Sequence, residues 1–470
     1  MKISLITPPR IAISPRDAAR VDVGVPHPGI LCIAEFLLSH GIETTILDLN
    51  VLPNKGSDKE VIDYISNEKP DVVGLTALTC NYPHIVRIAR IVRSIAPDIK
   101  TIAGGIHISL NHEDILSSHE AALFDFLVYG EGEKATLGLI QHFAGAKSLK
   151  DIMGICYKDR DGYIVKTPPV EQMLRPPVIK DAWNLLEIPK YTDGRKELGL
   201  SFNTMRGCYW RCNFCSEPLR WEGICMMPAE DVVAQITYLK ENFDPDYVLI
   251  GDSNFNISTK RIKKFIDIMK SEGLSIPFIF EGRADKIWEQ RKLLPALRKL
   301  GAFLIFFGGE RMDGTDLAYI GKALSPTMSE QAAMAVHESG IGLKTMFMFG
   351  LPCDTEESMK TQARLIQDKI RPEIPAFTSY TPIPGTLEYP RGQKYIRIHD
   401  LTYYTFNNSV CDTDFLHYQQ VHAIINSLWF NYWAREDNRS GILSHPNQAT
   451  RKFGRVYYDN LEMLPEYQAL

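Results

Sequence analysis

Residues 207–218 read GCYWRCNFCSEP and place three cysteines, Cys208, Cys212 and Cys215, within eight positions. Closely spaced thiolates of this kind bind zinc or iron–sulfur clusters. A structural zinc site needs four ligands, and no second pair of cysteines with this spacing follows along the chain. Cys225, ten residues beyond Cys215, is a candidate fourth ligand. Spacing alone therefore allows a zinc site, a closed iron–sulfur site completed by Cys225, or a cluster with one open position.

The cysteines directly follow the first of six short apolar segments that alternate with helical patterns. The expected strands are LGLSFNT, DYVLIGD, PFIFEGR, FLIFFGG, KTMFMFG and AFTSYTP, within residues 197–390. Strands that alternate with helices predict a parallel sheet, here a partial (β/α)6 barrel of the TIM type. Barrel enzymes carry their chemistry at the C-terminal ends of the strands, where the cysteine loop is expected. This position favours a catalytic cluster with an open coordination position, and we expect the cluster not to need Cys225.

Residues 1–145 predict a separate α/β domain with a doubly wound, Rossmann-like parallel sheet. The expected strands are KISLIT, ETTILDL, DVVGLTAL, IKTIAGGI and FDFLVYG. Sheets of this type bind ligands at the carboxyl ends of their strands. In this chain those ends are residues 79–80, 104–107 and 129–133, which are rich in glycine and small polar side chains.

Two further segments complete the expected organisation. Residues 146–196 predict a β-hairpin that turns at Asp161-Gly162, followed by a stiff proline-rich linker. Residues 391–470 predict a mainly helical segment, in which apolar residues recur at helical spacing between Val421 and Tyr432. Its aromatic face either packs onto the barrel or lines a substrate cavity.

Composition narrows the class of protein. The 470 residues carry a formal net charge of −5, so no basic field predicts nucleic-acid binding. No apolar run approaches the roughly 18–20 residues that a membrane span needs. The nine cysteines are an odd number in a chain without a secretory signal, which predicts free thiols in a reducing cytoplasm.

The motif Cys208-x3-Cys212-x2-Cys215, with Phe214 before the last cysteine, resembles the signature of the radical SAM superfamily. The resemblance implies that the three thiolates hold a [4Fe–4S] cluster whose fourth iron is bound by S-adenosylmethionine (SAM). Reduction of SAM by one electron then yields a 5′-deoxyadenosyl radical. It also implies an external one-electron donor such as flavodoxin or ferredoxin. The zinc site and a cluster used only for electron transfer are the alternatives.

Segments after each barrel strand also resemble this family. The residues expected near SAM on this basis are Phe214, Asp252, Glu281, Arg283 and Glu310. Ser253 stands where relatives carry a second acid, and Glu281 and Arg283 could instead form a structural pair. Two catalytic candidates follow from the last two strand ends, Cys353 in FGLPCDTEES and Tyr380 in YTPIPGT. Cys353 could deliver a hydrogen atom or a proton, or could be a small residue tolerated in a turn.

A parallel sheet before such a barrel resembles the cobalamin-binding subfamily of radical SAM enzymes. The resemblance assigns cobalamin contacts to one set of residues: Thr79, Gly104, Gly105, His107, Tyr129, Gly130 and Glu131. The chain lacks the Asp-x-His-x-x-Gly motif that ligates cobalt in cobalamin mutases, so that histidine ligand is not expected. The alternative is a sheet that serves as a scaffold without a corinoid.

These resemblances imply three candidate functions. The first is cobalamin-dependent methyl transfer to an unactivated carbon or a phosphinate centre. The second is a radical cyclase, oxidase or rearrangement enzyme without methyl transfer, and the third is a corinoid or cluster carrier without turnover. The expected substrate is a small molecule, and the aromatic residues 429–433 point to an apolar or planar one.

Overall fold

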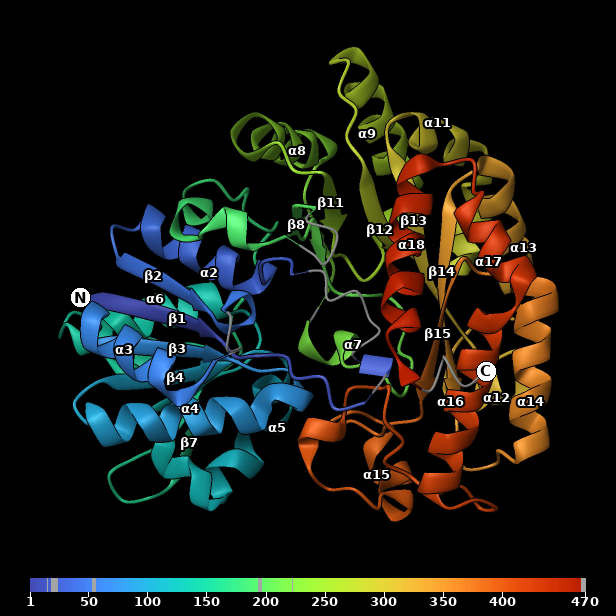
Figure 1. The fold of residues 1–470 in the computed structure, drawn as a ribbon. Coiled ribbons are helices and arrows are strands. Elements are labelled where there is room, and N and C mark those ends of the chain that lie inside the picture. The colour runs from blue at the N-terminus through green and yellow to red at the C-terminus, as the bar shows by residue number, and fades with distance from the viewer. Residues whose placement is uncertain (15, 18–23, 53–55, 193–196, 222, 466–470) are drawn as a thin grey trace.

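The computed structural model describes residues 1–470 apart from 15, 18–23, 53–55, 193–196, 222 and 466–470. Two α/β lobes lie side by side, each built around its own sheet (Figure 1). The fold class expected from the sequence is confirmed: a parallel, doubly wound N-terminal sheet, a second parallel sheet and a helical C-terminal segment.

The first sheet has the strand order β2-β1-β3-β4-β5-β6-β7. Its first five strands are parallel and are β1 (Lys2–Thr7), β2 (Glu43–Asp48), β3 (Val72–Thr76), β4 (Lys100–Gly104) and β5 (Phe126–Val128). All five lie within the predicted strands. Their nearly continuous apolar sequence is explained by helices on both faces of the sheet.

The predicted hairpin extends this sheet. It consists of β6 (Ile155–Lys158) and β7 (Ile164–Lys166), and β6 pairs antiparallel with β5 through Leu127 and Cys156. The first sheet therefore continues to Lys166. The hairpin covers the edge of β5, whose backbone groups would otherwise be unpaired.

Two helices cover one face of the first sheet and three cover the other (Figure 1). On the first face lie α2 (Pro28–Ser39) and α6 (Gly132–Phe143), and on the second lie α3 (Asp58–Glu68), α4 (Tyr82–Ile95) and α5 (Ile106–Ser117). The predicted spacing of Ile85, Ile88 and Val92 corresponds to the buried face of α4. The C-terminal ends of the strands point toward the second lobe.

The second sheet is an open, parallel partial barrel in the strand order β8-β11-β12-β13-β14-β15. The strands are β8 (Gly199–Phe202), β11 (Tyr247–Ile250), β12 (Phe278–Gly282), β13 (Ala302–Glu310), β14 (Gly342–Phe349) and β15 (Ile374–Ser379). The helices between them are α8 (Ala229–Phe243), α9 (Thr259–Ser271), α10 (Ala284–Glu289), α11 (Leu294–Lys299), α12 (Gly314–Tyr319), α13 (Pro326–Ser339) and α14 (Glu356–Leu365). After β8, the short ladder β9 (Met205–Arg206) and β10 (Cys225–Met226) encloses the cysteine loop and α7 (Glu217–Arg220).

The C-terminal segment packs against the barrel. Its helices are α15 (Tyr389–Gly392), α16 (Tyr418–Ala434), α17 (Glu436–Leu443) and α18 (Gln448–Glu462). On α16, the Trp429 indole and the Tyr432 hydroxyl donate to the carbonyls of Pro375 and Pro372 at 3.1 and 2.7 Å. Because these aromatic side chains are buried in the core and do not line the cavity described below, they give no support to an apolar or planar substrate.

Helix α18 crosses the N-terminal ends of the barrel strands. Phe453 packs against Tyr247 of β11 and Phe303 of β13, and the Thr450 hydroxyl donates to the Phe303 carbonyl at 2.6 Å. The chain thus fills the end of the barrel opposite the cysteine loop with its own last helix. Among the described residues, no helix combines the length and the apolar character needed to cross a bilayer.

Candidate active site

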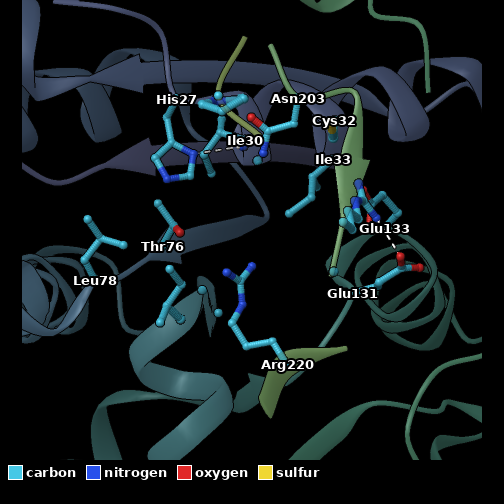
Figure 2. Close-up of a pocket in the computed structure, with 18 of the residues that line it drawn as sticks. His27, Ile30, Cys32, Ile33, Thr76, Leu78, Glu131, Glu133, Asn203 and Arg220 are labelled. Atoms are coloured by element: carbon cyan, nitrogen blue, oxygen red, sulfur yellow. Dashed lines mark hydrogen bonds and ion pairs between the residues drawn. The ribbon is translucent and has the colours of Figure 1, made fainter. Parts of the chain in front are cut away.

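A cavity of about 480 Å³ lies between the two lobes. Both sheets contribute strand ends and adjoining loops to its lining, including Thr76, Gly104, Gly130, Ser201, Gly251 and Glu281. Figure 2 shows side chains from both lobes around it, with His27 and Arg220 on opposite sides. One chamber is therefore reached from both domains.

The three cysteines lie on the loop between Arg206 and Glu217, two residues that line this cavity. The Cys215 amide donates to the Cys212 carbonyl at 3.1 Å, and burial raises the pKa of the Cys215 thiol to about 12. Cys212 and Cys208 raise that pKa further because their negative charges would repel a third thiolate. Three neighbouring thiols of this kind bind together as thiolates only around a cationic centre, which fits an iron–sulfur cluster.

Within the described ranges, no three His, Cys, Asp or Glu side chains are grouped as ligands of a single metal ion. A single zinc ion would gather all its thiolates about 2.3 Å from one point, whereas each thiolate of a four-iron cluster binds a different iron.

Two partners hold the cysteine loop in place. The Asn213 amide donates to the Ile320 carbonyl at 3.0 Å, and the Asn213 side chain donates to the Tyr319 carbonyl at 3.2 Å. Arg283 stacks on Trp210 with its guanidinium carbon 4.3 Å from the ring centre. Burial raises the pKa of the Cys212 thiol, and the nearby charges of Lys322 and Arg283 oppose that shift. Arg283 thus lies beside the cluster cysteines.

Glu310 and Phe214 also lie around the loop, outside the cavity lining. Glu310 ends β13 at a β-bulge with a φ of 62°, and its carboxylate pairs with Lys322 at 3.0 Å. A positive φ at a residue other than glycine costs free energy and is typical of functional positions. Phe214 is half-buried against the cluster of apolar side chains that includes Ile320 and Met348.

Asp252 directs its carboxylate toward the segment before the cysteine loop. It accepts hydrogen bonds from the Thr204 and Met205 amides at 2.5 and 2.9 Å and from the Thr204 hydroxyl. Arg261 lies 3.4 Å away, and burial raises the pKa of Asp252 while Arg261 opposes that shift. Gly251 and Ser253 line the cavity instead. These contacts support a structural role for Asp252, and its binding of SAM stays a prediction.

Glu281 and Asn203 bring polar atoms into the cavity. Burial raises the pKa of the Glu281 carboxyl to about 7, and Lys344 opposes that shift. Asn203, just beyond β8, lines the same cavity, and its Oδ1 is buried without a hydrogen-bond donor. A buried acceptor of this kind is commonly satisfied by an ordered water molecule. The sequence analysis missed Asn203, although its position at a barrel strand end was a usable signal.

The glycines predicted to contact cobalamin lie at the cavity. Gly104 and Gly105 line it, and Gly105 adopts a φ of 95°, and a Cβ there would lie only 2.7 Å from the Thr76 hydroxyl oxygen. Gly130 has a φ of 74°, and a Cβ there would meet no atom within 4 Å. Open space thus lies beside the bare backbone of Gly130, which fits close approach of a large ligand.

Three other predicted cobalamin residues lie outside the cavity lining. The buried His107 Nδ1 lies 3.3 Å from the Thr79 hydroxyl, and burial lowers the pKa of His107 to about 4. Tyr129 stacks on His112 with 4.8 Å between ring centres and donates its hydroxyl to the Thr167 carbonyl. Thr79, His107 and Tyr129 thus contact other protein groups and lie behind the glycines that line the cavity.

Glu131 lines the cavity, but its carboxylate is bound within the protein. It pairs with Arg206 at 2.8 Å and accepts from the Met173 amide at 2.8 Å. The Glu131 carboxylate thus forms an ion pair with Arg206 of the other lobe, and its contact with cobalamin stays a prediction.

His27 and Arg220 are cavity residues that the sequence analysis did not select. His27 Nδ1 accepts from the Ile30 amide at 3.3 Å, and burial lowers the pKa of His27 to about 4. His27 is therefore neutral at pH 7, and its proton sits on Nε2. Arg220 pairs with Glu217 at 3.1 Å and stacks on Trp221 at 4.6 Å.

The two catalytic candidates do not line the cavity. Cys353 lies at the surface, and partial burial of its thiol together with the negative charge of Asp316 raises the pKa of that thiol to about 11. Tyr380 is buried and donates its hydroxyl to Glu388 at 2.7 Å. These positions support structural roles, and catalysis by either residue stays a prediction.

Fold and site define a two-lobed enzyme of the radical SAM type. A family model for the B12 binding domain matches residues 17–140, and a model for the radical SAM superfamily matches residues 202–366. The chain therefore contains a B12 binding domain followed by a radical SAM domain. Its cofactors are accordingly a [4Fe–4S] cluster, SAM and cobalamin, and the cysteine loop and the glycine-lined cavity fit them.

Three known proteins illustrate the similarity. The anaerobic magnesium-protoporphyrin IX monomethyl ester cyclase of Rubrivivax gelatinosus is 28% identical over 386 residues, which are 80% of this chain and 68% of that protein. An uncharacterized methyltransferase of Pyrococcus horikoshii is 25% identical over 97% of this chain and 99% of its own length. The structure of the cobalamin-dependent S-adenosylmethionine radical enzyme OxsB, with aqua-cobalamin and S-adenosylmethionine bound, superposes with a TM-score of 0.73. At 15% identity it covers 97% of this chain and 70% of that chain, so it shows that the fold is shared.

Proposed function

We propose that this protein is a cobalamin-dependent radical SAM methyltransferase that methylates an unactivated carbon or a phosphinate centre of a small molecule. The observation that carries the proposal is the single cavity lined by the strand ends of both lobes. Methyl transfer by a radical route requires two cofactors to address one substrate, and this chamber gives both domains access to it. The similarity to the methyltransferase of Pyrococcus horikoshii, which extends over 97% of this chain, supports the same function.

The chain's own residues have distinct tasks in this proposal. Cys208, Cys212 and Cys215 hold the cluster, and the stack of Arg283 on Trp210 keeps their loop rigid. When bound, the cluster and SAM supply one-electron cleavage chemistry, and cobalamin supplies a carrier for the methyl group.

The cavity walls orient SAM and the substrate. Asn203 contributes its side chain to the cavity wall, and Glu281 offers a carboxyl group whose pKa is raised to about 7. The neutral His27 offers an N–H group from the opposite wall. Arg220 and Trp221 close one side of the chamber and limit the access of water.

A radical cyclase without methyl transfer is the second candidate. The similarity to the cyclase of Rubrivivax gelatinosus, at 28% identity, favours it. We also propose an external flavodoxin or ferredoxin as electron donor. A cytoplasmic location fits the three cluster cysteines, which are free thiols in the structure.

Products of SAM distinguish the candidates before the substrate is known. The full chain is reconstituted anaerobically with iron and sulfide, reduced with titanium(III) citrate and incubated with SAM, with and without hydroxocobalamin. A methyltransferase forms S-adenosylhomocysteine only when the corrinoid is present, together with 5′-deoxyadenosine. A cyclase forms 5′-deoxyadenosine alone. Absence of S-adenosylhomocysteine in the corrinoid-loaded sample contradicts methyl transfer, and absence of both products indicates a carrier.

A further inference from the structure

Three buried, charged side chains join the two lobes beside the cavity. Arg206 Nη1 lies 2.8 Å from Glu131 Oε1, and Nη2 lies 2.5 Å from Glu133 Oε1. A further hydrogen bond connects Arg206 Nη1 and Glu133 Oε2 at 3.4 Å. The three residues are only 8%, 5% and 2% exposed. We call Arg206, Glu131 and Glu133 the interlobe triad; Figure 2 labels its two glutamates on the cavity wall.

The triad connects the two parts of the chain that hold cofactors. Arg206 belongs to β9 and is followed after one residue by Cys208, the first cysteine of the cluster loop. Glu131 is the N-cap of α6, and Glu133 lies in its first turn. Gly130, at a strand end predicted to contact cobalamin, directly precedes Glu131. A shift of the triad would therefore move the cysteine loop and the glycine strand end relative to each other.

The chemistry of the triad makes this connection rigid. A guanidinium group donates through a planar fork, so two carboxylates on its edge fix its orientation as well as its distance. The Arg206 backbone pairs with Cys225 in the β9–β10 ladder, and its guanidinium faces the Trp221 ring at 5.6 Å. The Met173 amide donates to the second oxygen of Glu131 at 2.8 Å. The two carboxylates and the guanidinium thus have little freedom to rotate.

We propose that the interlobe triad sets the distance and orientation between the iron–sulfur cluster and the corrinoid. Arg206 is a positioning residue in this role, because it acts through the cysteine loop and touches neither reacting group. The proposal rests on the proposed function, since it assumes that both cofactors are bound.

Electron paramagnetic resonance gives a direct test. The full chain is loaded with the cluster and with hydroxocobalamin, then poised so that [4Fe–4S]⁺ and cob(II)alamin are both present. Dipolar interaction between the two paramagnets broadens or splits the cob(II)alamin signal by an amount set by their separation and orientation. Iron, sulfide and corrinoid per chain are measured on the same samples, so that only fully loaded protein is compared.

Four variants separate positioning from folding. Arg206→Met leaves two unpaired carboxylates and could unfold the protein, so the triple variant Arg206→Met, Glu131→Gln, Glu133→Gln removes all three charges together. Arg206→Lys keeps the charge without the fork. Tyr191→Phe is the matched control, because it removes another buried hydrogen bond away from the cysteine loop. In the wild type, the Tyr191 hydroxyl donates to Asp48 of the first lobe at 3.0 Å.

The expected result is a single, well-defined dipolar pattern in the wild type and in Tyr191→Phe. The triple variant gives a weaker and broader pattern at equal cofactor content, and Arg206→Lys gives an intermediate one. The ratio of S-adenosylhomocysteine to 5′-deoxyadenosine falls by up to about 100-fold in the triple variant, because misplacement by about 1 Å is costly in a transfer reaction.

Two results overturn the proposal in distinguishable ways. A wild-type dipolar pattern and product ratio in the fully loaded triple variant would reject the interlobe triad alone. Failure of the wild type to bind hydroxocobalamin would reject the proposed function and the triad's role with it.

Discussion

Replacement of Asp252 by asparagine tests whether this residue is structural or binds SAM. The substitution keeps the shape of the side chain but removes its charge. The Asn Oδ1 can still accept from the Thr204 and Met205 amides, whereas the new NH2 group faces Arg261 and the Thr204 hydroxyl. Arg261 is only 8% exposed and has no other carboxylate partner in the described ranges.

The size of the effect follows from this geometry. Removal of one partner from a buried ion pair costs about 3–5 kcal/mol, because the other charge stays buried. We take the lower end, about 3 kcal/mol, since Arg261 also donates to the Thr204 hydroxyl at 2.6 Å. Local opening of residues 204–206 should then become about 100-fold more frequent.

Amide hydrogen exchange of the cluster-free protein measures this opening. We expect exchange at Thr204 and Met205 to be about 100-fold faster in Asp252→Asn, with little change far from β9. Ser253→Ala is the control, because Ser253 lines the cavity and the structural account predicts a change within about 0.5 kcal/mol.

SAM affinity of the cluster-loaded variant provides the second measurement. The structural account expects SAM binding of the fully loaded Asp252→Asn protein to stay within about threefold of the wild type, which is less than 1 kcal/mol. Unchanged amide exchange together with a tenfold or larger loss of SAM affinity would refute it. That outcome would restore Asp252 as a SAM ligand.

Three further predictions concern other parts of the site. First, the raised pKa of Glu281, about 7, means that the folded protein binds more protons than the unfolded chain between about pH 4.5 and pH 7. The free energy of unfolding of the cofactor-free protein should therefore fall as the pH rises through this range, by at most about 3 kcal/mol. Urea denaturation should show no such fall in Glu281→Gln, and an equal dependence of the unfolding free energy on pH in both proteins would contradict the prediction. Second, Gly105→Ala should lower the affinity for hydroxocobalamin at least tenfold, since the new Cβ would lie 2.7 Å from the Thr76 hydroxyl oxygen. Titration followed by absorbance measures the affinity. Gly145→Ala is the control, because its Cβ would have nothing within 4 Å. Third, Cys225→Ala should keep a full iron content, whereas Cys215→Ala should lose the cluster; loss of iron in Cys225→Ala would restore Cys225 as the fourth ligand.

The strands of both sheets were predictable because each one is a short apolar run bounded by glycine or polar residues. KISLIT and FLIFFGG have the continuous apolar character of strands covered on both faces, and β1 and β13 lie at those positions. The cysteine loop was predictable for a related reason, since loops after barrel strands meet at one end of the barrel.

The orientation of individual strand-end residues was harder to predict. The alternation of a strand continues past the end of β11, so Leu249, Gly251 and Ser253 line the cavity while the Asp252 carboxylate contacts Thr204 and Met205. This alternation was present in the sequence and would have corrected the expectation for Asp252. The partners of Glu131 and Glu133 could not be found in this way, because Arg206 lies more than 70 residues away in another lobe. Only the packing of the two lobes brings these charges together.

The course of α18 has a consequence for how the chain acquires its fold during synthesis. The first sheet ends at Lys166 and can form on the ribosome long before the rest of the chain exists. The barrel differs, because Phe453 and Thr450 of its last helix pack against Tyr247 and Phe303 near the starts of two of its strands. Its core cannot be complete until α18 has left the exit tunnel. Nascent chains cut short before residue 448 should accordingly present a finished first lobe and an unfinished barrel to chaperones and proteases.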